Sequence, residues 1–192
     1  MKLSVWAVLI LSLGFLWGGN TQEPSASEES DESRAISQEL AEIYAADQAD
    51  RESLDFDDPK TIQKMMQGDQ KRLARVEEIV SAGKLSTGEN YYHAAMVLQH
   101  GRGEEHYLLS HVLATAAAFQ GHEPGRWLAA ASLDRYLNQI GKPQIFGTQY
   151  HKLGDAWSQE PYETSMADAI RRAYGVPTLE EGRARLEELR DR

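Results

Sequence analysis

The segment YLLSHVLATAAAF, residues 107–119, is apolar on nearly every side when it is drawn as a helix. A helix without a polar face belongs in the interior, covered by neighbouring helices. With 192 residues, the chain is long enough to supply those neighbours within one core. The segment therefore predicts an all-α bundle built around it.

Glycines and capping residues divide the rest of the chain into further helices. Asp58 and Ser86 are typical N-terminal caps, and glycine is typical where a helix ends. The expected stops are Gly83, Gly101, Gly121, Gly141 and Gly175. These signals predict helices at about 34–54, 58–82, 88–101, 104–120, 123–140, 163–174 and 178–191. Between them, an irregular segment at 141–162 is expected to fold over a central helical hairpin, giving a compact multi-helix bundle.

The first 22 residues have the pattern of a secretory signal peptide. Lys2 precedes an apolar run from Leu3 to Trp17, and a small, polar exit follows. The run is shorter than the roughly 20 residues that a membrane span needs. Because no clean cleavage motif follows the run, an uncleaved N-terminal anchor is the alternative. The sequence predicts export to the periplasm or the extracellular space, or a membrane tether in the alternative case.

Residues 23–33, EPSASEESDES, predict a disordered acidic linker. They hold five acidic residues and four serines but no basic residue, so they cannot bury enough apolar surface to order. Residues 34–192 then form a single helical domain. The chain has no cysteine, so disulfides and a cysteine-linked lipid are excluded.

Charge and missing motifs argue against several functional classes. The formal net charge is −10, and no basic run exceeds a pair of residues, so neither nucleic acid nor anionic lipid is an expected partner. The sequence contains no GxSxG, P-loop or GxGxxG motif. Its six histidines include no HExxH motif, so we expect no metal site and no cofactor.

The string ADQADR, residues 46–51, places charges where a helix should be apolar. Asp47, Asp50 and Arg51 fall within roughly 60° of the stripe formed by Ile36, Leu40, Ile43 and Leu54. Asp47 and Arg51 also have the i,i+4 spacing of a surface ion pair, which is the alternative interpretation. The position on the stripe favours a desolvated cluster of Asp and Arg.

A second set of polar residues follows in the string DR and the loop after it. Asp134 lies on the apolar side of its helix, between Trp127 and Leu137, and Arg135 lies near the edge of that side. Such a pair commonly ties down a neighbouring loop by charge-assisted hydrogen bonds. The loop KPQIFGTQY, residues 142–150, offers Gln144 and Gln149, whose amides suit backbone groups or a neutral polar ligand.

The string QHG, residues 99–101, completes the candidate site. His100 precedes a glycine at the predicted end of a helix, where helix carbonyls favour an imidazolium, so it has a structural interpretation as well. The full candidate set comprises Asp47, Gln48, Asp50, Arg51, Gln99, His100, Asp134, Arg135, Gln144 and Gln149.

Three functions remain open for this set. It can form a pocket of a binding module for an unknown protein or small polar ligand. It can serve a hydrolase or lyase, with Asp47 or Asp134 as acid or base and His100 as partner. Alternatively, it can be a packing network in a structural scaffold, with function elsewhere.

The strings ADQADR, QHG, DRYL and PQIFGTQ, in this order behind an export signal, resemble an uncharacterised bacterial family known only as a domain of unknown function. The likeness covers roughly residues 35–180 and implies no activity, substrate or catalytic residue. Residues 94–131 are also similar to short tetratricopeptide-like helical repeats, with small residues that let helices approach closely. Gly125 stands where such repeats prefer alanine.

Overall fold

The structure is a computed structural model that describes residues 30–153, 156–159 and 161–190. The predicted signal peptide and most of the predicted linker lie outside these residues. Helix α1 begins at Asp31, so the last three residues of the expected linker, 31–33, are helical. The Ser30 side chain accepts a hydrogen bond from the Ser33 backbone N–H, and the first-turn acids Asp31 and Glu32 are favoured by the helix dipole.

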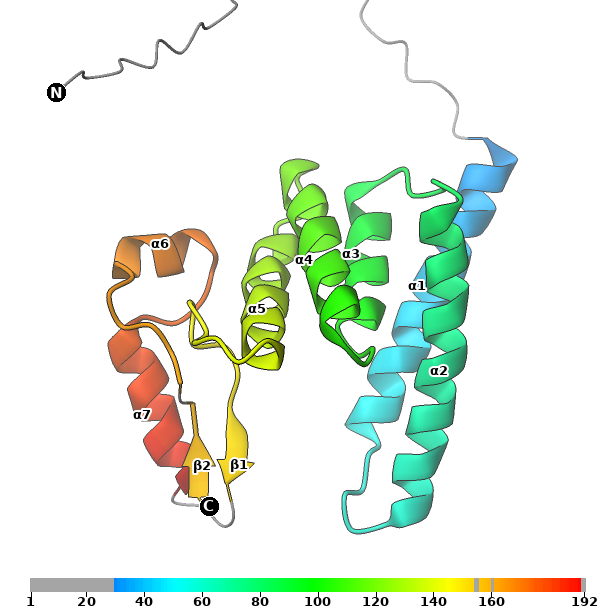
Figure 1. The fold of residues 1–192 in the computed structure, drawn as a ribbon. Coiled ribbons are helices and arrows are strands. Elements are labelled where there is room, and N and C mark those ends of the chain that lie inside the picture. Colours follow the sequence, from blue (N-terminus) through cyan, green and yellow to red (C-terminus); the bar gives the residue numbers. More distant parts are fainter. Residues whose placement is uncertain (1–29, 154–155, 160, 191–192) are drawn as a thin grey trace, which may run out of the picture.

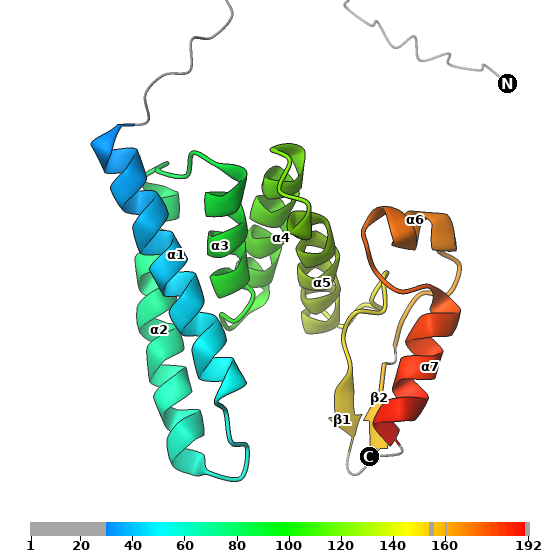
Figure 2. The same cartoon turned by 180° about the vertical axis from the view of Figure 1, so that it is seen from behind.

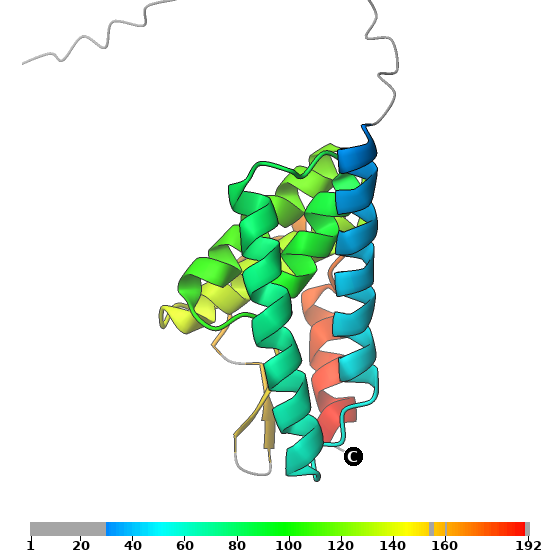
Figure 3. The ribbon, with the colours of Figure 1, turned by 90° about the vertical axis from the view of Figure 1, so that its right-hand side faces the viewer.

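The all-α prediction is confirmed, because the described residues form seven packed helices and one small strand pair. The helices follow one another in chain order, from the α1–α2 pair at one end to α6 and α7 at the other (Figures 1 and 2). Figure 3 shows the α1–α2 pair from its outer side, with α3, α4 and α5 inclined behind it. The helices are α1 (Asp31–Glu52), α2 (Pro59–Ser81), α3 (Gly88–Leu98), α4 (Glu104–Phe119), α5 (Pro124–Gln139), α6 (Asp168–Ala173) and α7 (Leu179–Arg190).

The segment 141–162 is more regular than predicted. It contains an antiparallel pair, β1 (His151–Leu153) and β2 (Ala156–Ser158), in which Lys152 faces Trp157. Strands of three residues are too short for a periodic signal in the sequence. The following helix, α6, begins at Asp168 rather than near 163, and α7 packs on β2.

Two of the predicted caps can be compared directly. Asp58 caps α2 as predicted, since its side chain accepts a hydrogen bond from the Lys60 backbone N–H. The cap of α3 is Thr87 rather than Ser86, and it accepts from the Asn90 backbone N–H at 3.1 Å. Ser86 bonds to the Asn90 side chain instead.

Helix α4 is less enclosed than its sequence predicts. It packs between α3 and α5, but Leu108, Val112 and Phe119 are 42, 53 and 88 % exposed. Ala114 and Ala117 form the buried side, where small residues allow close helix approach. The arrangement of helices in a row explains the difference, because α4 has close neighbours on two sides only (Figure 1).

None of the helices in the described part of the chain combines the length and hydrophobicity of a bilayer crossing.

Gly125 sits where α5 approaches the backbone of α4. A Cβ atom built at this position would lie 2.6 Å from the Ala114 carbonyl oxygen and 2.9 Å from the Ala118 nitrogen. We therefore expect Gly125→Ala to lower the free energy of unfolding by about 1–3 kcal/mol, despite the better helix propensity of alanine. Urea unfolding followed by circular dichroism measures the change. Arg126→Ala, at the exposed neighbouring position, should change stability little, and an equal loss in both variants would contradict the steric explanation.

Candidate functional site

Asp47 is the centre of a buried polar network between α1 and the end of α3. Its side chain is fully buried. Arg51 Nη1 donates to Asp47 Oδ1 at 2.8 Å, and Gln48 Nε2 donates to Oδ2 at 2.8 Å. His100 Nδ1 lies 3.0 Å from the same Oδ2. A buried carboxylate requires such partners, and Asp47 has three of them.

Helix α2 completes the network with Asp69 and Arg72. Asp69 accepts hydrogen bonds from Arg51 at 3.1 Å and from Arg72 Nη2 at 2.8 Å. Arg72 Nη1 also donates to Asp50 Oδ2 at 2.8 Å. Burial acts to raise the pKa of Asp69, but the two guanidinium groups outweigh it and hold that pKa below its ordinary value. Three carboxylates thus share two arginines.

His100 is held by this network and has one ring nitrogen to spare. Burial lowers the pKa of His100 below its ordinary value, although the hydrogen bond with Asp47 acts in the opposite direction. The neutral imidazole carries its proton on Nδ1 when Asp47 is ionised, because a carboxylate accepts and does not donate. None of the described residues hydrogen bonds to Nε2, which therefore carries a free lone pair.

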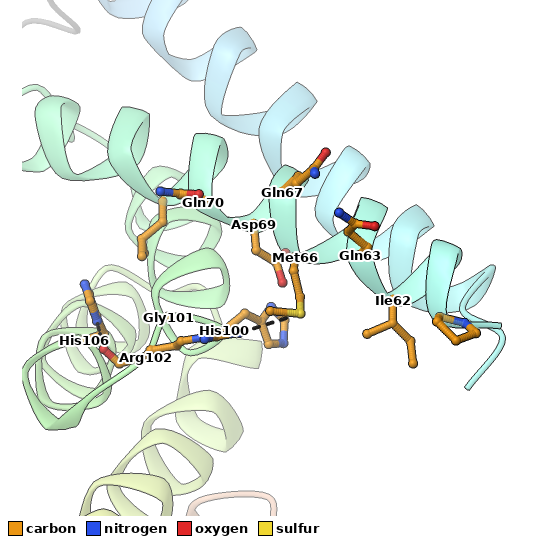
Figure 4. A pocket seen from close by; sticks show the side chains of 12 residues that line it. Ile62, Gln63, Met66, Gln67, Asp69, Gln70, His100, Gly101, Arg102 and His106 are labelled. Carbon is orange, nitrogen blue, oxygen red and sulfur yellow. Dashed lines mark hydrogen bonds between the residues drawn. The ribbon is translucent and has the colours of Figure 1, made fainter. Parts of the chain in front are cut away.

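A groove of about 710 Å³ opens beside this network, between α2 and the turn that joins α3 to α4. Figure 4 shows Met66 and Asp69 directed from α2 toward His100 at the turn. Asp69 and His100 belong to both the groove and the network, so ion pairs and hydrogen bonds position these two lining side chains. The lining residues are Pro59, Ile62, Gln63, Met66, Gln67, Asp69, Gln70, Leu73, His100, Gly101, Arg102 and His106.

Asp134 belongs to a second cluster, which organises the loop after α5. Its buried carboxylate accepts hydrogen bonds from the backbone N–H groups of Ile145, Phe146 and Thr148, at 2.7, 3.0 and 2.9 Å. The Thr148 hydroxyl donates a fourth at 2.8 Å. Asp134 thus has the loop-binding role that we considered for the Asp134–Arg135 pair, whereas no described hydrogen bond joins Arg135 to the loop.

The glutamines of the loop are directed toward backbone groups. Gln144 is fully buried; its amide donates to the Gln149 carbonyl at 3.0 Å and accepts from the Gln149 N–H at 2.9 Å. Gln149 Nε2 donates to the Ala131 carbonyl at 3.2 Å, which fastens the loop to α5. Arg171 and Gln159, which we did not predict, also donate to loop carbonyls.

The candidate residues therefore divide between two clusters. The contacts of the described residues join Asp47, Gln48, Asp50, Arg51 and His100 in the first cluster, and Asp134, Gln144 and Gln149 in the second. Gln99 donates to the Met96 sulfur at 2.6 Å and has no described contact with the first cluster. Arg135 lines a separate cleft on α5.

Sequence reasoning missed the α2 residues of the first cluster and groove. Asp69 and Arg72 have i,i+3 spacing, which is also typical of solvated helix surfaces, so nothing in α2 alone distinguishes them. The glutamines at 63, 67 and 70 do share one side of a helix, and that repeat was an available signal.

No family model, curated protein or solved structure matches this chain. The function therefore rests on the geometry of the described residues. Among these, no group of three or more histidine, aspartate or glutamate side chains gathers as metal ligands do.

Proposed function

We propose that this chain is an exported binding protein of the cell envelope, whose groove beside α2 holds an extended peptide segment. The observation that carries the proposal is the groove itself, which lies beside the ion-pair network and is lined by exposed amides. Its volume of about 710 Å³ lies in the range of ordinary ligand sites. The pattern of residues 1–22 supports the export part of the proposal.

The amides of Gln63, Gln67 and Gln70 support a peptide as the ligand. They are exposed on α2, and no described residue hydrogen bonds to them. An amide both donates and accepts, as a peptide backbone requires. Seven helical residues rise by about 10 Å, which matches roughly three residues of an extended chain. The row therefore suits a short stretch of backbone.

The apolar part of the groove supports side-chain contacts from the same ligand. Ile62 and Leu73 line it at either side of Met66, which is 42 % exposed. Methionine is flexible and polarizable, so it adapts to different apolar partners. The three aspartates of the network exceed its two arginines by one charge, and Arg102, which also lines the groove, offsets that charge. These features favour a neutral segment with apolar side chains.

One observation favours the enzymatic alternative, a hydrolase or lyase. Asp47 orients His100 with Nε2 unbonded, as a general base requires. Against it, the four hydrogen bonds from the loop occupy Asp134, the second proposed carboxylate. The groove lining also includes no serine, threonine or cysteine as a nucleophile. Binding is therefore better supported than catalysis.

Selection from a random peptide library on the full chain tests the proposal. Enriched peptides should bind the wild type, and Met66→Ala/Gln70→Ala should weaken binding by at least about ten-fold, measured by fluorescence anisotropy. Gln38→Ala removes an exposed glutamine of α1 outside the groove and should leave binding unchanged. If the selected peptides bind the groove variant and the wild type equally, the groove is not the peptide-binding site. Mass spectrometry of the bound peptide separates the alternatives: an intact peptide supports binding, whereas cleavage that depends on His100 would establish the enzyme.

A further inference from the structure

Two adjoining clefts lie along the C-terminal half of α5 and the loop that follows it, and their described lining shares no residue with the groove. The smaller cleft has a volume of about 250 Å³ and is lined by Tyr107 and Arg135, among others. The larger cleft has a volume of about 470 Å³, and Lys142 is among its lining residues. Asn138 and Gln149 line both clefts, so the two clefts are neighbours. Their described lining residues include no aspartate or glutamate, although the chain carries a net charge of −10. The clefts are thus locally cationic in an acidic protein.

Arg135 differs from the buried arginines of the Asp47 network because it has no counterion. No carboxylate of the described residues lies within ion-pair distance of it, and its buried Nε has no hydrogen-bond partner. Burial lowers the pKa of Arg135; Tyr107 acts to raise that pKa, and the like charge of Arg51 acts to lower it further. By contrast, Arg51 and Arg72 each contact two or more aspartates.

Asn138, one turn further along α5, also has an unsatisfied polar atom. Its Oδ1 is buried without a partner. Exchanging the amide oxygen and nitrogen places an N–H donor at the same position, since the two are assigned from their surroundings. Asn138 lines the same cleft as Arg135 and Tyr107, and its amide can supply a donor there. One cleft is therefore lined by a cationic side chain and by two neutral side chains that can donate hydrogen bonds.

From this arrangement we infer that the cleft beside Arg135 binds a small oxyanion, a carboxylate or a phosphate. The guanidinium fork matches the oxygen spacing of both groups and would receive the charge that it lacks in the free protein. Tyr107 and Asn138 supply neutral hydrogen bonds, and Lys142 in the adjoining cleft attracts a second negative group on a larger ligand.

The lack of a counterion also allows an anion-binding role of Arg135 to be distinguished from a purely structural role. A buried cation without a partner opposes folding, because its desolvation is not repaid. Arg135→Met should therefore keep or raise the midpoint of thermal unfolding in the absence of anions. A clear fall in that midpoint would assign Arg135 to packing and overturn the inference.

Thermal unfolding and titration calorimetry of the full chain test the site, with inorganic phosphate and citrate as separate probes at constant ionic strength. The wild type should be stabilised by at least one probe in a saturable manner, and the better probe identifies the class. Arg135→Gln should weaken binding by at least about ten-fold. Arg126→Gln, an exposed arginine at the other end of α5, should not. Equal binding by both variants, or no binding of either probe at millimolar concentration, would overturn the inference.

Discussion

Asp134→Asn should lower the free energy of unfolding by about 3–5 kcal/mol, the range for breaking a buried charged interaction. The substitution preserves the shape of the side chain, so packing on α5 is unchanged. One of the two acceptor oxygens becomes an NH₂ group, which faces the donors that the carboxylate now satisfies. The Thr148 N–H and hydroxyl, or the Ile145 and Phe146 N–H groups, would lose their acceptor.

Urea unfolding measured by both far-ultraviolet circular dichroism and tryptophan fluorescence gives this change. The loop contributes Ile145 and Phe146 to packing against α5 and Tyr174, so its release should also expose apolar surface. Asp57→Asn is the matched control, because Asp57 is exposed in the turn between α1 and α2. A loss of less than about 1 kcal/mol for Asp134→Asn would mean that water replaces the carboxylate, and that the loop does not depend on it.

The inward positions of Asp47 and Asp134 could be predicted because helical periodicity fixes the face on which a residue lies. Both aspartates fall on apolar stripes in the sequence, and both are fully buried in the structure. The periodicity, together with cap and glycine signals, also placed helices α1 to α5 and α7 within a few residues. A local pattern of this kind needs no knowledge of the neighbouring elements.

The partners of those aspartates could not be predicted, because they depend on how helices pack. Asp47 meets His100, 53 positions away, and Asp134 meets backbone N–H groups of an irregular loop, 11 to 14 positions away, that follows no helical period. One combined site and two separate clusters are equally compatible with the same stripes. The exposed side of α4 was missed for the same reason, since an apolar helix does not show how many neighbours cover it.

Arg72→Met should produce the second large effect, a loss of about 2–4 kcal/mol in the free energy of unfolding. Arg72 bridges Asp50 and Asp69, and its Nε lies 3.8 Å from Asp47. Without it, Asp47 and Asp69 keep Arg51 as their only arginine partner, and Asp50 has no ion-pair partner among the described residues. The expected loss lies between the values for surface and fully buried ion pairs, because water reaches part of Asp50 and Asp69.

The pH dependence of this loss identifies its electrostatic origin. The pKa of Asp69 is depressed in the folded protein, so its ionisation contributes stability above the unfolded pKa, and that contribution disappears as the pH falls through the folded pKa. Arg72→Met removes much of this contribution, so the two proteins should differ most at neutral pH and converge in acid. Arg75→Met, one turn away on α2 in an exposed pair with Glu39, should cause a much smaller loss. A difference between wild type and Arg72→Met that does not change with pH would instead assign the loss to packing of the arginine side chain.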